Sequence, residues 1–133
     1  MTKTNQRNLF GEPLVACSVA PMTGYFRTGC CETDENDQGS HTVCAVMTEE
    51  FLQFSLAMGN DLITPRLYWN FPGLQPGDRW CLCVARWKEA YDAGVAPFVV
   101  LEATNENALR VATMQQLIER AHKQVDNVVS KGE

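Results

Sequence analysis

The sequence predicts an α+β fold, a single two-layer sandwich in which a small, mainly antiparallel sheet carries helices on one face. Three observations support this fold class. Residues 42–47 form a β-branched, apolar run of strand length, and an apolar stripe at helical spacing follows over 49–58. A longer helical stripe occupies residues 79–93, and two short runs of strand character lie within 98–112. We expect one domain over 1–133, because a chain of this length buries about 65 to 70% of its unfolded surface.

The strand and helix near the middle of the chain have clear local signals. Thr42–Met47 is predicted to be a buried strand because it combines β-branched and apolar residues over a strand length. Thr48 can cap the helix that follows through its side-chain hydroxyl. Glu49 and Glu50 also favour a helix start here, because their negative charges lie near the positive end of the helix dipole. Gly59 is expected to end this helix.

Three segments are expected to be irregular. Glycines and prolines break residues 1–25 into short apolar steps, which predicts an N-terminal arm lying on the domain. The acidic segment 32–39 is polar throughout and should be exposed. The polar tail 130–133 should fray.

Residues 60–78 predict a long loop rich in aromatic residues, because three prolines and two glycines interrupt every regular element. Loops longer than about 12 to 15 residues are uncommon in compact domains and are often functional. The alternative is a lid that only covers the core with Tyr68, Trp69 and Phe71.

Residues 79–93 can be interpreted in two ways. Asp78 can cap a helix over Arg79–Ala93, because apolar residues recur there at helical spacing. The alternative is a strand over Arg79–Val84, in which Cys81 and Cys83 share a face, whereas a helix separates them by about 200°. We expect the helix because the stripe is uninterrupted.

The C-terminal part is predicted to be a hairpin followed by a helix. Phe98–Thr104 and Ala108–Ala112 read as two strands joined by a short polar turn. Thr113 then opens the last helix. Its apolar face contains Met114, Leu117, Ile118, Ala121, Val125 and Val128.

Composition bounds the partners and the location. The net charge of -5 argues against a nucleic-acid or anionic membrane surface, because phosphate binding requires an excess of Lys and Arg. No apolar run reaches the roughly 18 residues of a membrane span. The first residues lack the apolar region of a secretory signal, so we expect a soluble, cytoplasmic protein with a small-molecule or protein partner.

The six cysteines are expected to be reduced and mostly buried as small apolar side chains, because cytoplasmic thiols rarely form disulfides. Adjacent cysteines rarely bridge one another, so a disulfide of Cys30 or Cys31 would need a distant partner. Cys31 with Cys83 is one such pair.

Several short runs resemble a family of small bacterial and plant-plastid proteins classed as a domain of unknown function. The runs cover nearly all of the chain except its ends. The resemblance implies a two-layer α/β sandwich and implies no particular activity, substrate or catalytic residue. The runs are Gly11–Leu14, Thr23-Gly24, Gly29–Cys31, Ser40–Thr48, Gly59–Leu62, Phe71–Leu74, Gly77–Cys83, Arg86–Ala90 and Val99–Thr104.

A metal site of the Cys and His type is one functional hypothesis, with zinc or iron as the ion. The candidate ligands are irregularly spaced in the sequence, unlike the paired Cys-x2-Cys motifs of structural zinc sites. The alternative is therefore that the chain binds no metal cofactor. The candidate ligands are Cys30, Cys31, His41, Cys44, Cys81 and Cys83.

Thiol chemistry gives two further hypotheses, a thiol-redox protein and a cysteine-dependent enzyme, and the sequence leaves open whether the chain is an enzyme. Cys81 lies beside Arg79 at the start of the expected helix, where a thiolate is favoured. Cys31 is a further candidate nucleophile, and His41 is the candidate base.

A pocket for an anionic small molecule is a further hypothesis, since arginine and aromatic side chains occur together in and after the long loop. The alternative role for these side chains is surface solubility. The leading hypothesis is a soluble small-ligand-binding or accessory domain whose ligand the sequence does not identify. We expect its site between the loop 60–78, the start of the second helix and the segment His41–Cys44. The candidate ligand-binding residues are Arg66, Tyr68, Trp69, Asp78, Arg79 and Trp80.

Overall fold

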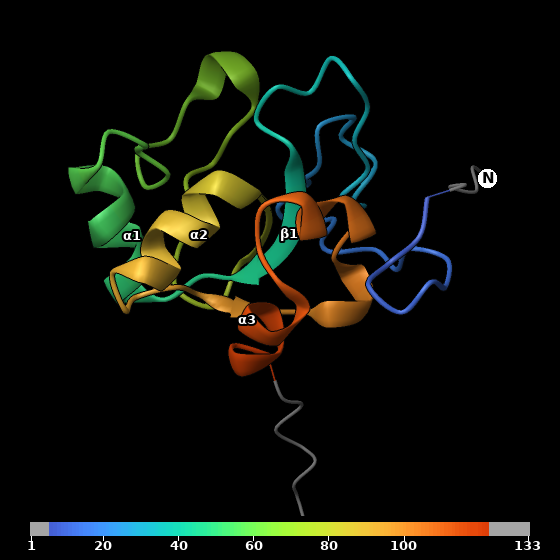
Figure 1. Cartoon of the computed structure of the whole chain (residues 1–133). Helices are drawn as coiled ribbons and strands as arrows, with labels where there is room; N and C mark the ends of the chain where they lie inside the picture. The colour runs from blue at the N-terminus through green and yellow to red at the C-terminus, as the bar shows by residue number, and fades with distance from the viewer. Residues whose placement is uncertain (1–5, 123–133) are drawn as a thin grey trace, which may run out of the picture.

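A computed structural model describes residues 6–122 of the chain (Figure 1). Its centre is a three-stranded sheet in the order β2-β1-β3, built from β1 (His41–Val46), β2 (Arg79–Cys83) and β3 (Phe98–Val99). Both outer strands pair with β1 in the antiparallel sense. The mixed α+β class with a small antiparallel sheet is therefore confirmed.

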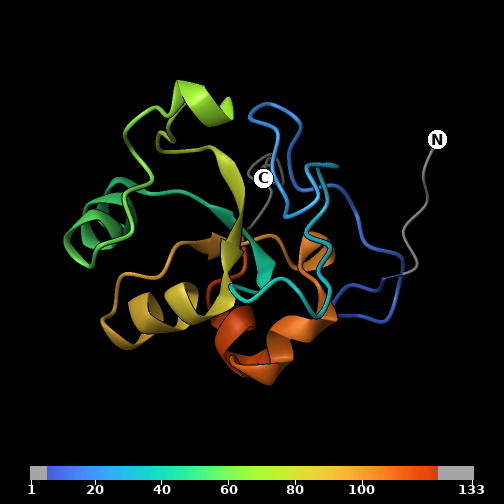
Figure 2. The same ribbon diagram turned by 90° about the horizontal axis from the view of Figure 1, so that it is seen from above.

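The two faces of the sheet are covered differently. Helices α1 (Glu49–Ala57) and α2 (Val84–Asp92) lie together on one side of the sheet. The N-terminal arm lies on the other side, as Figure 2 shows from above, and it extends to Cys31 rather than only to the predicted Tyr25. Alternate residues of β1 serve the two faces, because successive side chains of a strand point in opposite directions. Val43 and Ala45 join the core under the helices, and Cys44 joins a separate cluster under the arm.

The predicted central strand and first helix are confirmed. Thr48 caps α1, where its hydroxyl accepts a hydrogen bond from the Phe51 backbone N–H at 3.0 Å. Phe51 and Leu52 are buried in the core under the helices. Gly59 follows the helix with φ +92°, a left-handed conformation that glycine adopts readily.

The prediction of a helix from Arg79 was wrong at its beginning. Residues Arg79–Cys83 form strand β2, and the helix begins only at Val84. The apolar residues Trp80 and Leu82 fit the alternation of a strand, and the spacing from Val84 to Trp87 fits a helix, so the two periods merge into one stripe. Pairing with the edge of β1 decides between them.

The predicted hairpin over residues 98–112 was also wrong. Within residues 98–112, β3 is the only strand, and short 3₁₀ helices follow at Leu101–Ala103 and Glu106–Arg110. Thr104 explains the change, because its hydroxyl accepts from the Cys44 N–H at 3.1 Å and donates to the Val100 carbonyl at 2.9 Å. A side-chain hydroxyl thus takes the place of the backbone pairing that would have extended β3 along β1.

The last helix, α3 (Met114–Glu119), is shorter than predicted. Thr113 and Gln116 form the capping box that starts it. It ends before Ala121, which instead bridges to β3. Leu117 packs in the core, whereas Ile118 is exposed. The expected positions of Val125, Val128 and the tail 130–133 lie outside the described residues.

The arm is fastened to the rest of the fold by two buried asparagines. Asn8 donates to the Glu102 carbonyl at 3.0 Å. Asn105 donates to the Gln6 side chain at 2.6 Å and to the Cys31 carbonyl at 3.1 Å. Both asparagines are about 1% exposed, so these bonds hold the arm without access to water.

Two disulfides hold the arm against the sheet, Cys17 to Cys44 and Cys31 to Cys81. We call these four buried residues the sulfur cluster. The expectation of reduced cysteines was therefore wrong for these four residues, as was the pairing of Cys31 with Cys83, whereas Cys30 and Cys83 are free. Cys44 and Cys81 are opposite each other in the β1–β2 ladder, and their shared face is the one that the arm covers.

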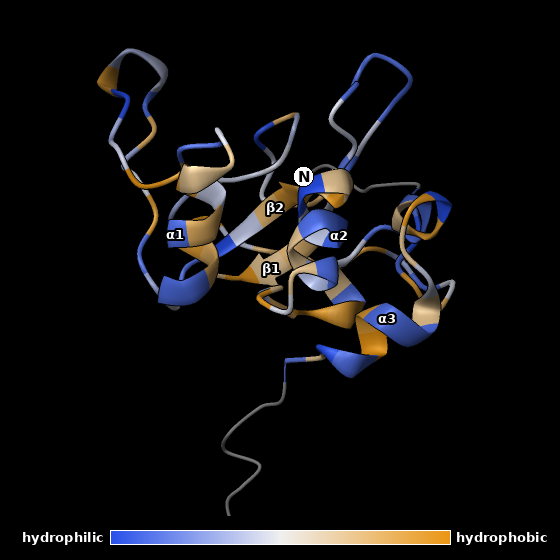
Figure 3. Ribbon diagram, turned by 60° about the vertical axis from the view of Figure 1, so that its left-hand side comes forward, coloured by the Kyte–Doolittle hydropathy of each residue, from blue (hydrophilic) through white to orange (hydrophobic). Residues whose placement is uncertain are grey.

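Hydropathy follows this layering. Figure 3 shows hydrophobic colour along β1 and hydrophilic colour on the outer turns of α1 and α3. Within residues 6–122, none of the helices is long and apolar enough to cross a membrane.

Candidate functional site

A cleft lies at the outer edge of β2, between the arm and the loop that follows α1. It consists of two adjoining hollows of about 270 and about 240 Å³, which share His41, Leu62 and Trp80. We call it the His41 cleft. Its other lining residues are Gly24, Tyr25, Arg27, Gly39, Asn60, Cys81, Leu82, Cys83 and Arg86.

His41 is held in this cleft by the carboxylate of Asp37. Its Nδ1 lies 2.7 Å from Asp37 Oδ1, and its backbone N–H donates to Asp37 Oδ2 at 2.9 Å. The Asp37 side chain is 1% exposed, whereas that of His41 is 39% exposed. The carboxylate is thus an internal support, and the imidazole is the part that a ligand can reach.

The hydrogen bonds to Asp37 keep it ionised. Burial alone raises the pKa of this carboxyl, but the hydrogen bonds from His41 and from the Thr33 hydroxyl outweigh burial and lower the pKa below its ordinary value. An ionised carboxylate only accepts hydrogen bonds, so His41 Nδ1 carries the proton. In the neutral imidazole, Nε2 is then free to accept a proton from a ligand.

The backbone before β1 fixes the position of the ring. A Cβ at Gly39 would lie 2.6 Å from His41 Cε1, so only glycine lets the imidazole lie this close to the chain. The β1–β2 register is irregular between His41 and Val43. Such a bulge redirects a side chain, and here His41 lines the cleft while Cys44 stays in the sulfur cluster.

Aromatic and cationic side chains surround the imidazole. The Tyr25 ring is stacked on His41 with 6.4 Å between centroids, and the Arg27 guanidinium lies 5.2 Å from the centre of Trp80. Arg86 borders the opposite end of the cleft, where it contacts Glu89 at 3.3 Å. Two cations and two flat rings therefore border one space.

Cys83 brings a free thiol to the same cleft. It is paired with His41 in the ladder and is the N-cap of α2, where the helix dipole favours negative charge. Cys30 is the other free cysteine of the described residues. Burial, and then the charge of Glu32, raises the pKa of the Cys30 thiol, which disfavours its reactive thiolate form.

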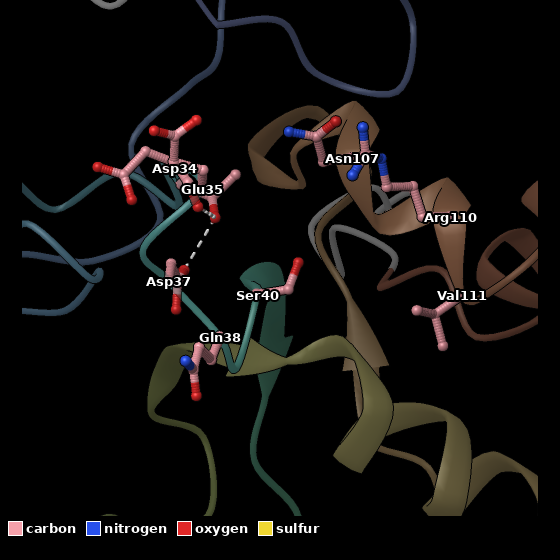
Figure 4. A pocket seen from close by; sticks show the side chains of 9 residues that line it. Asp34, Glu35, Asp37, Gln38, Ser40, Asn107, Arg110 and Val111 are labelled. Carbon is pink, nitrogen blue, oxygen red and sulfur yellow. Dashed lines mark hydrogen bonds between the residues drawn. The ribbon is translucent and has the colours of Figure 1, made fainter.

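A second, more polar hollow of about 420 Å³ lies behind Asp37. Figure 4 shows Asp34 and Glu35 on one side of it and Asn107 and Arg110 on the other, with the hydrogen bond from Thr33 to Asp37 between the loop residues. The acidic loop was expected to be exposed throughout, but Thr33 and Asp37 are buried. The Asp37 carboxylate forms its hydrogen bonds inside the protein, including those with His41.

The predicted ligand-binding residues do not gather in one place. Trp80 lines the cleft. Tyr68 and Trp69 are 94% and 67% exposed on a 3₁₀ turn (Leu67–Trp69), and Arg66 beside them is exposed and bonded to Asp61. Asp78 and Arg79 are half-buried at the turn into β2, where Asp78 accepts from the Gln75 N–H.

The predicted metal and catalytic residues divide into two groups. Cys31, Cys44 and Cys81 belong to the sulfur cluster, so Cys81 and Cys31 are not free nucleophiles in this disulfide form. His41 and Cys83 line the cleft. Cys30 is half-buried outside both, so the six candidate ligands do not converge on one site.

Sequence reasoning missed Asp37, Tyr25, Arg27 and Cys17. Asp37 precedes His41 by four residues, and this spacing was a usable signal for a carboxylate that supports the ring. Tyr25 and Arg27 gave no such signal because their partners are distant in the sequence. Cys17 lies outside the cysteine-rich runs, and only the path of the arm brings it to Cys44.

Comparison with known proteins agrees with the resemblance found in the sequence. No curated protein matches the chain. The family described as an uncharacterized protein conserved in bacteria (DUF2237) matches residues 7–121, which include the arm, the sheet, the helices and every residue of the His41 cleft. The chain therefore belongs to the DUF2237 family.

Proposed function

We propose that the chain binds a small anionic ligand in the His41 cleft and that His41 exchanges a proton with it. The observation that carries this proposal is the buried Asp37 carboxylate, 2.7 Å from the Nδ1 of an imidazole that is itself 39% exposed. Burying a carboxylate costs free energy, and its hydrogen bonds are aimed at orienting one accessible ring.

The surroundings favour a ligand that combines negative charge with a flat group. Arg27 and Arg86 stand near the two ends of the cleft and can attract a carboxylate or phosphate. The Trp80 and Tyr25 rings offer faces for stacking. The two hollows together suit a molecule of metabolite size rather than a polymer, which agrees with the net charge of -5.

Ligand-observed NMR with a panel of small carboxylates and phosphates tests this proposal. We expect at least one aromatic acid or phosphate to bind, and His41→Gln to weaken its binding at least tenfold. His122→Gln is the matched control, because His122 lies outside the cleft, near Phe98 and Glu119. Equal binding by wild type and His41→Gln, or no binding by any panel member, would count against the proposal.

A second candidate function is acyl transfer by Cys83, favoured by its place opposite His41 and at the N-cap of α2. The thiol proton would pass to His41 Nε2 as the sulfur attacks an acyl carbon, and the leaving group would take that proton. Water would then hydrolyse the thioester and release the acid. Asp37 would orient the imidazole throughout.

Alkylation by iodoacetamide at one near-neutral pH separates the two candidates. If Cys83 is a nucleophile, peptide mapping will show it alkylated at least tenfold faster than Cys30, and His41→Gln will remove most of that difference. Equal rates at Cys83 and Cys30 would leave ligand binding as the function and exclude the thiol mechanism. A soluble, cytoplasmic location remains part of this proposal.

A further inference from the structure

Four cysteine sulfurs converge where the arm meets the sheet. Cys44 and Cys81 are directly opposite each other on β1 and β2, and Cys17 and Cys31 reach them from the arm. All four residues are at most 4% exposed. The sulfur atoms of Cys17, Cys31 and Cys81 lie within 4.8 Å of one another. The Cys44 sulfur lies outside this close group but is bonded to that of Cys17.

We propose that this sulfur cluster is a four-cysteine zinc site when its thiols are reduced, and that the two disulfides are its metal-free, oxidised form. Zinc bound to four thiolates is tetrahedral with Zn–S distances of about 2.3 Å, which places the sulfurs roughly 3.8 Å apart. The sulfurs of Cys17, Cys31 and Cys81 already lie within 4.8 Å of one another. On reduction the two bonded pairs must separate, and the Cys44 sulfur must move toward the other three.

The surroundings of the sulfurs favour zinc over other ligands. Val46, Val100 and Ala103 pack against the cluster. The Cys44 N–H is bonded to Thr104, and the Cys81 N–H to Thr23. An apolar site with four soft ligands and no open position is typical of structural zinc.

The chemistry balances with a dithiol as reductant. Two dithiol molecules give four electrons and four protons to the two disulfides, which become four thiols while each dithiol closes to its own disulfide. One Zn²⁺ then displaces the four thiol protons and bonds to the four sulfurs. A reducing compartment, such as the expected cytoplasm, would favour this form.

The test uses the full chain, reduced with dithiothreitol without oxygen and separated from excess reagent. After addition of zinc and gel filtration, elemental analysis should find one zinc per chain, and N-ethylmaleimide should label only Cys30 and Cys83 until a chelator is added. Cobalt in place of zinc should give the absorption of a tetrahedral thiolate complex. Protein left oxidised should retain less than a tenth as much metal.

Variants assign the metal to this cluster. Cys44→Ser with Cys81→Ser should abolish the cobalt absorption, and Cys30→Ser with Cys83→Ser is the matched control that should keep it. Because the first pair could unfold the chain, the labelling pattern of the wild type decides independently. Reduced wild type that retains no zinc, or a cobalt signal lost only in the control pair, would overturn the proposal.

Discussion

The two faces of the sheet are stabilised by different means. The face under α1 and α2 buries large apolar side chains such as Phe51 and Trp87, whereas the face under the arm is held by the sulfur cluster and by buried asparagines. Helices present continuous apolar stripes and need only packing. An arm without regular structure presents few apolar side chains, so covalent and polar links replace the missing surface.

The largest effect should come from the helix-covered face. We expect Phe51→Ala to lower the free energy of unfolding by about 3 to 5 kcal/mol, because Phe51 is 1% exposed and its removal leaves a cavity. Urea unfolding followed by circular dichroism measures the loss. Leu67→Ala is the control, since Leu67 is 84% exposed and should change stability by less than about 0.5 kcal/mol. Similar values for both variants would contradict this account of the core.

We expect a smaller loss of stability when a disulfide is removed from the arm-covered face. In oxidised protein, Cys31→Ala with Cys81→Ala should reduce the free energy of unfolding by about 2 to 4 kcal/mol, because this disulfide closes a loop between residues 50 apart. Cys30→Ala serves as the control for removal of a free thiol. If the double variant unfolds at the wild-type urea concentration, the arm does not depend on this bond.

A single polar link should contribute still less. Asn105→Ala is expected to cost about 1 to 3 kcal/mol, because it removes the hydrogen bonds that the buried Asn105 side chain donates to Gln6 and to the Cys31 carbonyl. Hydrogen exchange should accelerate at the Glu106 N–H, which is bonded to the Arg7 carbonyl. Asn107→Ala, at a half-buried neighbour, is the control. Unchanged exchange in Asn105→Ala would show that other contacts hold the arm.

The smallest effect depends on pH. The pKa of Asp37 is lowered in the folded state, so its ionised form stabilises the fold above its ordinary pKa of about 4, and this stability is lost as pH falls through the lowered value. Asp37→Asn should flatten the acid side of the stability profile, and Asp34→Asn at an exposed position should not. Parallel profiles for wild type and Asp37→Asn would refute the role of Asp37.

The sequence predicted the elements whose signals are local. The strand at 42–47 and the helix after Thr48 follow from composition and capping in one short segment. The start of α2 could not be predicted, because the apolar residues of Arg79–Cys83 fit both the helical and the strand period. Pairing with β1, which the sequence of this segment does not reveal, makes it a strand. The hairpin failed for a similar reason, since the Thr104 hydroxyl bonds to strand groups distant in the sequence.

The sequence indicated some of the residues that line the His41 cleft and missed others. His41, Trp80 and the loop after α1 were indicated by their residue types and lie in or beside one cleft. Asp37 was hidden in an acidic run that looks solvated, and the arm residues Tyr25 and Arg27 depend on how the arm folds back. Pairing of the cysteines depends on the same path, which spacing alone does not determine.

The most direct test of the His41 cleft is the ¹⁵N NMR spectrum of the histidine rings, recorded with and without a ligand from the panel. We predict that the neutral His41 ring carries its proton on Nδ1, bonded to Asp37, and that the ligand shifts the Nε2 resonance of His41 while His122 stays unchanged. A His41 ring protonated on Nε2, or a ligand that shifts both histidines equally, would contradict the proposed site.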